Sequence, residues 1–518
     1  MSSIVNSNGP VWNVREFGAM GDRSRLDTRA VQGAIDACAA AGGGVVYCPP
    51  GDYLIGSVEL KTNVNLHLEA GATLWGSTDK ADYDLSNKLP VTGARHAQLN
   101  SAHLVFARSA QNVAITGRGS IDGQGDTYFV SVPGSARLGL KGWRPERLIA
   151  FINCRNVLVE GVRLANSPGW MLWPLGCEQV RITGVRIETN PWGPNTDGID
   201  PDCCRDVYIS DCYIDAGDDC IALKSSANLL GDGRACENVT VTNCTMRTTC
   251  CAIRVGYEGD GPIRNCTFSN LVFFKTRTGI NMLAPRDAAN QIEHGPPIEN
   301  ISFSNIVMDT QIACYLWIGD DAAAPGRIRN VSLQGVRATT ERAGYFGGSR
   351  SIPIENLRLS DIDLTVRGAT NDEFAREVPY PYPVFDNWIK RGIPHALYCR
   401  HVRGLDMSDI RVRWSDASGP WGSALWCQHV SDLTLRGLNA RQGPASDAPV
   451  VRLENVSRAC LNSCRTEPGA GTFLRLAGPA SGDVVAIGNH LADAAKPFDL
   501  ADDLPPGAFT GQFNHMGQ

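Results

Sequence analysis

The sequence has no strong excess of charge, and this absence limits the partners it can have. Its formal net charge is −6 and its isoelectric point is near 5.9. A mildly acidic chain is a poor match for nucleic acid or for an anionic membrane surface. We therefore expect neither as a partner.

A long apolar run and a visible leader are also missing. No stretch of about 18 apolar residues, the length that crosses a bilayer, occurs in the chain. The opening MSSIVNSNGPVWNV has no basic segment followed by an apolar one, as a signal peptide would. We expect a cytoplasmic protein, or a periplasmic or secreted one if a leader has been removed.

Zinc-type cysteine spacing is absent although the chain has 18 cysteines. The adjacent pairs Cys203-Cys204 and Cys250-Cys251 do not fit a zinc site. Most cysteines lie among Val, Ile and Thr, as in CENVTVTNC, which is typical of small buried hydrophobic residues.

Turns and short strands fill most of the chain, because 54 glycines and 29 prolines exclude a fold of long helices. One helix is expected at about 28–40, with Asp27 and Thr28 as candidate N-caps and glycines after it. Its apolar residues recur at helical spacing, at Ala30, Val31, Ala34, Ile35 and Cys38.

From about residue 103 a β-strand motif repeats, as in CRNVLVEGVRLANS, CRDVYISDCYIDAG and IENISFSNIVMDT. Irregular spacing without intervening helices favours a parallel β-helix over a leucine-rich horseshoe or a propeller. The polar residue at each turn can stack into a hydrogen-bonded ladder. The anchor positions of this repeat are Asn156, Gln179, Asp206, Asn238, Asn265, Asn300, Asn330 and Asn356.

We expect a single all-β domain over residues 1–518, with a cap region at 1–45 that contains the short helix. One continuous stack of coils should then run from about 45 to 490. A loop at about 366–399, rich in proline and aromatic residues, interrupts the repeat near the expected cleft. It is either functional or a flap that covers an edge.

Eight aspartates gather in NTDGIDPDCCRDVYISDCYIDAGDDCIALKSS, from Asn195 to Ser226. Asp197 precedes Asp218 by 21 residues, close to one coil, and adjacent coils are about 4.8 Å apart. Asp197, Asp218 and Asp219 can therefore lie together on one open face, where they repel one another unless protons, cations or chemistry use them. The other acidic residues fit turns and the ladder.

The motif NTDGID, followed one coil later by GDDCIALKS, resembles the signature of the polygalacturonases, glycoside hydrolase family 28. The opening FGAMGD and the later GWRPERLIAFINC and ALYCRHVRGL are similar to that family too, so the resemblance covers most of the chain. It implies a right-handed parallel β-helix and hydrolysis with inversion, with Asp218 as the general acid. Asp197 and Asp219 would activate water, and neither a cofactor nor a metal would be needed.

Other motifs of that family are replaced here. Cys251 stands where a histidine is usual, Arg254 replaces a serine, and Asn281 and Leu283 replace an arginine and a lysine that hold the sugar carboxylate. We expect poor activity on unmodified polygalacturonate, and a neutral sugar, or a uronate bound through Arg254, at the cleavage subsite. Arg254 could equally be a surface residue.

Aromatic residues and a histidine complete the expected site. Trp170, Trp173 and Trp192 would form a platform for a sugar ring, or the first two would close the coil interior. His395, in the interrupting loop, would help to wall one end of the cleft and favour attack at a chain end. The candidate substrate-binding residues are Asn195, Lys224, Cys251, Arg254, Asn281, Trp170, Trp173, Trp192 and His395.

The leading hypothesis is an inverting glycoside hydrolase that acts from a chain end on oligosaccharides of pectin or a related polysaccharide. A uronate lyase or epimerase is an alternative, in which carboxylates bind Ca²⁺ and Arg254 or Lys224 takes a proton. A non-catalytic glycan-binding relative is a third. The sugar, its linkage and the oligomeric state are left open by the sequence.

Overall fold

The structure is a computed structural model that describes residues 10–84, 102–286, 294–319, 326–342, 344–367, 395–415 and 421–517. It divides into two compact units, and the division falls between Thr249 and Cys250. Unit 1 lies before this point and unit 2 after it. Each unit is built from parallel strands, and the expected fold class, a right-handed parallel β-helix, is confirmed. The single domain with one continuous stack stays a prediction.

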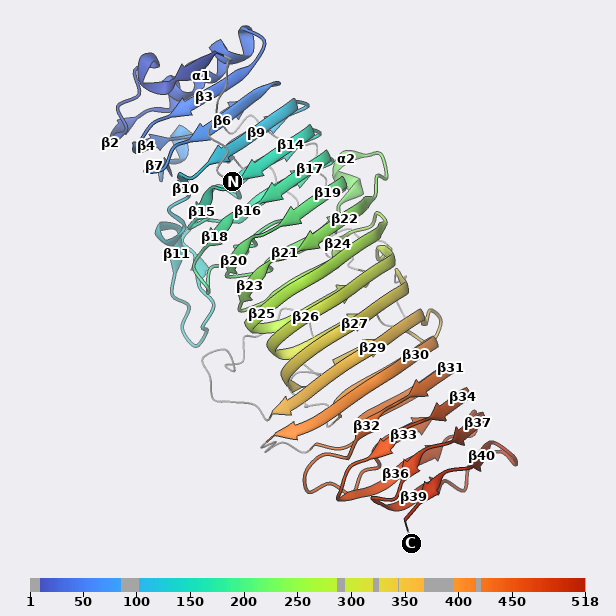
Figure 1. Ribbon diagram of the computed structural model, residues 1–518. Helices are drawn as coiled ribbons and strands as arrows, with labels where there is room; N and C mark the ends of the chain where they lie inside the picture. Colours follow the sequence, from blue (N-terminus) through green and yellow to red (C-terminus); the bar gives the residue numbers. More distant parts are fainter. Residues whose placement is uncertain are drawn as a thin grey trace. The chain divides into compact units, whose positions relative to one another are not determined.

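Unit 1 arranges its parallel strands in three stacks, which Figure 1 shows as successive arrows. The first stack contains β5 (Val58–Leu60), β8 (His103–Arg108), β13 (Arg147–Ile152), β16 (Trp170–Leu175) and β21 (Ile221–Ser225). The second contains β1 (Val11–Asn13), β3 (Gly44–Cys48), β6 (Val64–Leu68), β9 (Gln111–Gly117), β14 (Arg155–Glu160), β17 (Glu178–Thr183), β19 (Arg205–Ser210) and β22 (Cys236–Thr242). The third contains β2 (Asp22–Leu26), β4 (Gly51–Ile55), β7 (Ala72–Gly76), β10 (Ser120–Asp122), β15 (Arg163–Ala165), β18 (Arg186–Glu188), β20 (Tyr213–Ala216) and β23 (Thr245–Thr248).

The core of unit 1 consists of like residues stacked on successive coils. Val113, Val157, Val180 and Val207 occupy equivalent register positions on β9, β14, β17 and β19, and all are buried. Alternate residues point to opposite faces of a strand, so one face of each strand supplies the interior. Burying each such side chain contributes about 1.5–3 kcal/mol, and no coil could bury its own apolar face alone.

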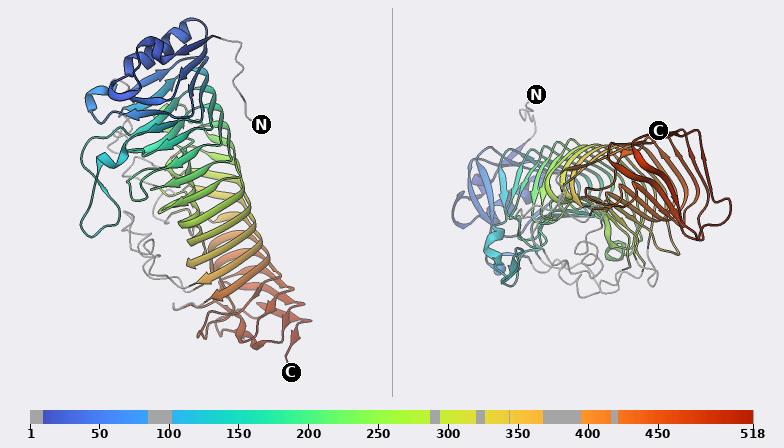
Figure 2. Two further views of the ribbon diagram at one scale, coloured as in Figure 1. Left: turned by 60° about the vertical axis from the view of Figure 1, so that its left-hand side comes forward. Right: turned by 90° about the horizontal axis from the view of Figure 1, so that it is seen from below.

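The expected cap helix is confirmed as α1 (Thr28–Ala40), which lies across the first coils of unit 1 (Figures 1 and 2). The predicted apolar residues of this helix are its buried ones. Its N-cap differs from the expectation, because the Asp27 side chain makes no capping bond. The Asp27 carboxylate instead accepts hydrogen bonds from the backbone N–H groups of Met20 and Gly21, at 2.7 and 3.0 Å, and so fixes the preceding turn.

The predicted polar ladder is present in both units. In unit 1 the amide of Asn156 donates to Asn112 at 2.8 Å, and that of Asn238 donates to Asp206 at 2.9 Å. In unit 2 the series Asn265, Asn300, Asn330 and Asn356 is joined by bonds of 2.9–3.0 Å. These residues have positive φ values, which asparagine and aspartate tolerate better than most residues.

One excursion leaves the coils of unit 1 between residues 123 and 146. It contains the 3-10 helix η4 (Gly125–Tyr128) and the antiparallel pair β11 (Phe129–Val130) and β12 (Gly139–Leu140). It projects from the side of the coils (Figures 1 and 2). The other short helices are η1 (Val14–Phe17), η2 (Lys80–Asp82) and α2 (Ala227–Leu230).

Unit 2 has longer strands that continue around the corners of the coil. Strand β25 pairs in parallel with β26 along almost its whole length, from Ile263 to Leu283. The strands of unit 2 are β24 (Cys251–Gly259), β25 (Ile263–Leu283), β26 (Pro297–Trp317), β27 (Arg327–Arg342), β28 (Gly344–Gly347), β29 (Ile354–Arg367), β30 (Leu397–Ser415), β31 (Leu425–Arg436), β32 (Asn439–Ala440), β33 (Val451–Glu454), β34 (Ser457–Asn462), β35 (Arg465–Thr466), β36 (Ala470–Ala477), β37 (Gly482–Ile487), β38 (His490–Leu491), β39 (Ala494–Leu500), β40 (Phe509–Gln512) and β41 (His515–Met516).

The cysteines behave as predicted, because all 18 are free and all but Cys460 are buried.

The interrupting loop falls mostly on residues 368–394, which lie outside the described residues. Among the residues that the structure does describe, no helix has the length and apolar character needed to cross a membrane.

Candidate active site

The first strand stack of unit 1 positions the aspartates. After β16, the chain continues the stack through parallel bridges that pair Leu172 with Ile199 and Ile199 with Ile221. Asp197 and Asp219 each lie two residues before these isoleucines, so they occupy equivalent positions on consecutive coils. The backbone N–H of Gly198 donates to the Asp219 carbonyl at 2.9 Å, which fixes this register. Asp219, rather than Asp218, is therefore level with Asp197.

The three predicted aspartates converge. One carboxylate oxygen each of Asp197, Asp218 and Asp219 lies within 4.8 Å of the other two. The expected proximity is confirmed, but the three residues are only 3, 8 and 4 % exposed, so they do not lie on an open face. Such a trio of oxygens could hold a hard cation such as Ca²⁺ or Mg²⁺. Without a cation or a proton, three charges at this distance destabilise the folded state.

Lys224 provides a positive charge beneath these carboxylates. Its ammonium nitrogen lies 3.4 Å from Oδ2 of Asp197 and 3.7 Å from Oδ1 of Asp200. Lys224 is 1 % exposed, and strand β21 holds it in register with Asp202 on the previous coil. A buried ammonium group needs such partners to stay charged. Lys224 therefore positions Asp197 from below, and its expected contact with substrate stays a prediction.

The environment of Asp197 strongly perturbs the acidity of its carboxyl group. Burial, followed by the charge of Asp200, raises its pKa well above the usual value, and Asp218 and Asp219 raise it further. Lys224 opposes these effects. The neutral form of the Asp197 carboxyl group is therefore more favoured than that of an exposed aspartate.

Asp218 has a cationic partner that the sequence did not suggest. The guanidinium of Arg137, from the excursion between β11 and β12, donates to Oδ2 of Asp218. An adjacent cation favours the ionised carboxylate. The hydroxyl of Thr248 donates to the backbone carbonyl of Asp218 and fixes its main chain.

The tryptophans of β16 are packed into the protein. Trp173 has no exposed surface, and its indole N–H donates to Asp202 at 3.3 Å. Trp170 lies edge-on to Trp173, with the Arg147 guanidinium 3.6 Å and the Lys224 ammonium 4.0 Å from its ring centroid. This burial favours the second interpretation, in which the two rings pack within the protein, over a sugar platform. Burial also lowers the pKa of Arg147 to about 10.

Asn195 and Trp192 lie on the loop that leads to Asp197. Asn195 is exposed, has a φ of 55°, and accepts a hydrogen bond from Arg144 at 3.3 Å. Arg144 also donates to the carbonyl groups of Pro168 and Pro194, at 2.6 and 2.5 Å. Arg144 therefore fixes the approach to the aspartates. Trp192 is half-buried, and its role as a sugar platform stays a prediction.

Two of the remaining aspartates of the cluster belong to the polar ladder, as predicted, whereas Asp200 and Asp202 are fully buried. Asp206 and Asp211 accept ladder bonds from Asn238 and Asn243, at 2.9 and 3.3 Å. Asp202 accepts from the Ser226 backbone at 2.7 Å.

Unit 2 contains the residues that replace the family motifs. Arg254 is 4 % exposed, so the interpretation of an exposed surface residue is wrong. Its Nη2 lies 3.5 Å from the sulfur of Cys251 and 3.8 Å from that of Cys250, and Arg277 donates to Cys250 at 3.1 Å. The two sulfurs are 3.9 Å apart. Two guanidinium groups thus face two thiols, and sugar binding by Cys251 and Arg254 stays a prediction.

Asn281 is in register with Arg254 on one side and with Tyr315 on the other. It has no exposed surface, and neither polar atom of its side chain has a hydrogen-bond partner among the described residues. Leaving a buried amide unpaired costs about 1–3 kcal/mol. This supports the expectation that Asn281 binds a ligand.

His395 is buried in unit 2. Its Nδ1 accepts a hydrogen bond from the Ser423 backbone N–H at 3.1 Å, and its ring centroid lies 4.8 Å from that of Trp426. Burial lowers the pKa of His395 to about 4, so the ring is neutral near pH 7. Its expected place in the wall of a cleft stays a prediction.

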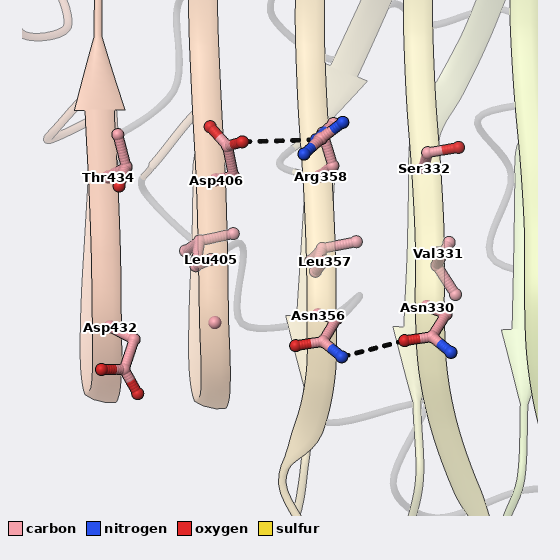
Figure 3. A pocket seen from close by; sticks show the side chains of 11 residues that line it. Asn330, Val331, Ser332, Asn356, Leu357, Arg358, Leu405, Asp406, Asp432 and Thr434 are labelled. Carbon is pink, nitrogen blue, oxygen red and sulfur yellow. Dashed lines mark hydrogen bonds and ion pairs between the residues drawn. The ribbon is translucent and has the colours of Figure 1, made fainter.

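A shallow groove of about 470 Å³ lies on the outer face of unit 2, across β27, β29, β30 and β31 (Figure 3). Arg358 and Asp406 form an ion pair at 3.3 Å within it, and Asn356 and Asn330 form part of the ladder. At Gly404 the ladder lacks a side chain. Much of its polar lining is thus already paired within the fold.

The family model described as "Glycosyl hydrolases family 28" matches residues 38–379. A probable polygalacturonase of Vitis vinifera is 33% identical over 276 residues, which are 52% of this chain and 55% of that protein. An exopolygalacturonase of Platanus acerifolia is 24% identical over 376 residues, 70% of this chain and 93% of that protein. The solved structure of a hyperthermoactive exopolygalacturonase from Thermotoga maritima shares the fold, with a TM-score of 0.61, 24% identity, and coverage of 78% of this chain and 92% of that one.

Proposed function

The chain belongs to the glycosyl hydrolases family 28, whose model matches more than half of it, and we propose that it hydrolyses oligosaccharides of pectin from a chain end. It is thus a glycoside hydrolase. The observation that carries the proposal is the convergence of Asp197, Asp218 and Asp219 within 4.8 Å. The preference for chain ends is supported by relatives that are named exopolygalacturonases.

The proposed roles follow from the chemistry of glycoside cleavage. Asp218 donates a proton to the leaving oxygen, and Asp197 and Asp219 remove a proton from the attacking water. Of the three, Asp218 keeps the largest exposed fraction, which suits a group that must meet the glycosidic oxygen. Lys224 holds Asp197 from the buried side.

We propose inversion at the anomeric carbon, as the family resemblance implies. The nearest oxygens of the three carboxylates are closer than the separation of about 6.5–9.5 Å that is general for inverting pairs. Proton NMR of the newly formed reducing end decides the point. An inverting enzyme gives the anomer opposite to the substrate linkage as first product, and a retaining enzyme gives the same anomer.

The lyase alternative has weaker support from the structure. A lyase base must be able to lose its proton. Lys224 is 1 % exposed and contacts two carboxylates, which hold its ammonium form. Arg254 is a guanidinium, which does not lose its proton in proteins. Hydrolysis requires neither residue to act as a base.

The experiment is a product analysis. Hexagalacturonate labelled at its reducing end is incubated with the protein in the presence of EDTA, and products are separated by chromatography. Hydrolysis from a chain end predicts monogalacturonate and a saturated pentamer as first products, whereas internal cleavage gives shorter oligomers at once. Ultraviolet absorbance of an unsaturated uronate, with a Ca²⁺ requirement, would establish a lyase instead. Binding without turnover would support the non-catalytic alternative.

A further inference from the structure

Arg137 is a cation that lies directly on the proposed general acid. Its guanidinium donates to Oδ2 of Asp218, across 81 residues of sequence. The Arg137 side chain is 31% exposed and that of Asp218 is 11% exposed. The ion pair is therefore accessible from solvent, in contrast to the buried pair of Lys224 and Asp197.

The excursion that carries Arg137 is anchored to the coils. The backbone N–H of Leu138 donates to the carbonyl of Trp192 at 2.9 Å, and the amide of Asn190 donates to Asp126 at 2.8 Å. The hydroxyl of Ser135 exchanges hydrogen bonds of 3.0 and 3.1 Å with the backbone of Arg137. These contacts fix the main chain at Arg137 and so hold its guanidinium near Asp218.

The charges around Asp218 explain what this cation can do. Asp197 and Asp219 face Asp218 from the coils, Lys224 lies beyond Asp197, and Arg137 approaches from the excursion. A uronate that enters this site brings a fourth carboxylate, which the other three repel. A guanidinium binds a carboxylate through two parallel hydrogen bonds. Arg137 can thus offset the repulsion.

We propose that Arg137 releases Asp218 and binds the carboxylate of the substrate's uronate in its place. This exchange allows Asp218 to become protonated for catalysis. The proposal rests on the function proposed above and names Arg137 as the residue that recognises the substrate's carboxylate. While Arg137 binds Asp218, that carboxyl group stays ionised and is a poor acid. Only a substrate with a carboxylate releases it.

In the proposed exchange, the proton for this step comes from within the cluster. It leaves the carboxyl group of Asp197 and binds the carboxylate of Asp218, whose oxygens lie within 4.8 Å. Asp197 is then ionised and can accept a proton from water, and Asp218 can donate one to the leaving oxygen. No proton enters or leaves the protein when substrate binds. The raised pKa of Asp197 in the free protein is consistent with this starting state.

The test compares two substrates that differ only in the carboxylate: trigalacturonate and its methyl ester. Arg137→Gln should lower kcat/KM on the acid by about 10–100-fold, the loss expected for a charge-assisted hydrogen bond. On the ester the same variant should keep or raise kcat/KM, because Asp218 is no longer held ionised by Arg137. Arg137→Lys should retain more activity on the acid than Arg137→Gln does. Lysine keeps the positive charge but cannot form the two parallel hydrogen bonds of a guanidinium. Arg186→Gln, which removes an exposed arginine paired with Glu188, is the matched control and should alter neither.

Calorimetry separates this proposal from the proposed function. Wild-type protein should bind the acid more tightly than the ester, and Arg137→Gln should lose that preference, whether or not turnover occurs. Binding of the acid in buffers of different ionisation enthalpy should show no net proton uptake. Equal losses on both substrates, an unchanged preference in the variant, or uptake of about one proton per site would overturn the exchange. Absence of turnover with retained preference would overturn only the hydrolase assignment.

Discussion

The ammonium nitrogen of Lys224 lies 3.4 Å from Oδ2 of Asp197, and both side chains are almost completely buried. The same nitrogen lies 3.7 Å from Asp200, which is fully buried as well. One buried cation therefore serves two buried carboxylates. The stability of unit 1 and the protonation of its aspartates are thus coupled through Lys224.

Replacing Lys224 by methionine should destabilise the protein. The change leaves buried carboxylates without their cation, which costs about 3–5 kcal/mol in the free energy of unfolding at neutral pH. Urea denaturation measures it. The control is Lys61→Met, which removes an exposed ion pair with Glu59 and should cost less than about 1 kcal/mol. A loss at Lys224 no larger than at Lys61 would contradict the account.

The pH dependence of stability should carry the signature of Asp197. Its folded-state pKa is raised, so between about pH 4, the usual aspartate value, and the folded value, the folded protein holds a proton that the unfolded chain releases. The contribution of this group to the free energy of unfolding is fully present at low pH, and it is lost as the pH rises through that window. Asp197→Asn should flatten this part of the curve of unfolding free energy against pH. Parallel curves for the two proteins would refute the assignment.

The ladder residue Asn300 should matter through its backbone conformation and its amide. It has a φ of 58°, donates to Asn265 and accepts from Asn330. Asn300→Ala should destabilise by about 1–3 kcal/mol, because it combines left-handed strain with lost hydrogen bonds. Asn300→Gly relieves the strain and should cost less. Thermal unfolding of both variants checks the order, and a glycine variant less stable than the alanine variant would contradict it.

Long unmodified polygalacturonate should be a poor substrate. Asn281 and Leu283 are neutral and buried where the family has a cationic pair, so internal subsites lack that recognition. Viscosity should fall slowly while reducing ends appear only from chain termini. Rapid loss of viscosity, unaffected by Arg254→Ala, would show internal cleavage and contradict this expectation.

Features that depend on local spacing could be predicted from the sequence. The helix at Thr28–Ala40 follows from apolar periodicity, the ladder from the repeated asparagine before each strand, and the aspartate cluster from the length of one coil. The exact register between coils does not follow from this length. Asp219 is level with Asp197 because of the β-bridges at Ile199, and the periodicity of the sequence does not reveal these bridges.

Features that depend on distant segments could not be predicted. Arg137 contacts Asp218 from an excursion that has no repeat, 81 residues earlier in the chain. Arg144 and Arg147 also reach the site from the stretch GWRPERLIAF, where only the surplus of arginine beside a buried strand gave a signal. The burial of Trp173 was one of two open interpretations, because a tryptophan of this kind suits a platform and a core equally.

The most direct test of the central claim is the rate of Asp218→Asn on two leaving groups. On the natural oligosaccharide, loss of the proton donor should lower kcat by at least about a hundredfold. On a nitrophenyl glycoside, which needs little protonation to leave, the loss should be much smaller. Asp197→Asn and Asp219→Asn should be slow on both, because water activation is still required. Near-normal activity of Asp218→Asn on the oligosaccharide would contradict the acid assignment and leave the cluster as a cation-binding or structural feature.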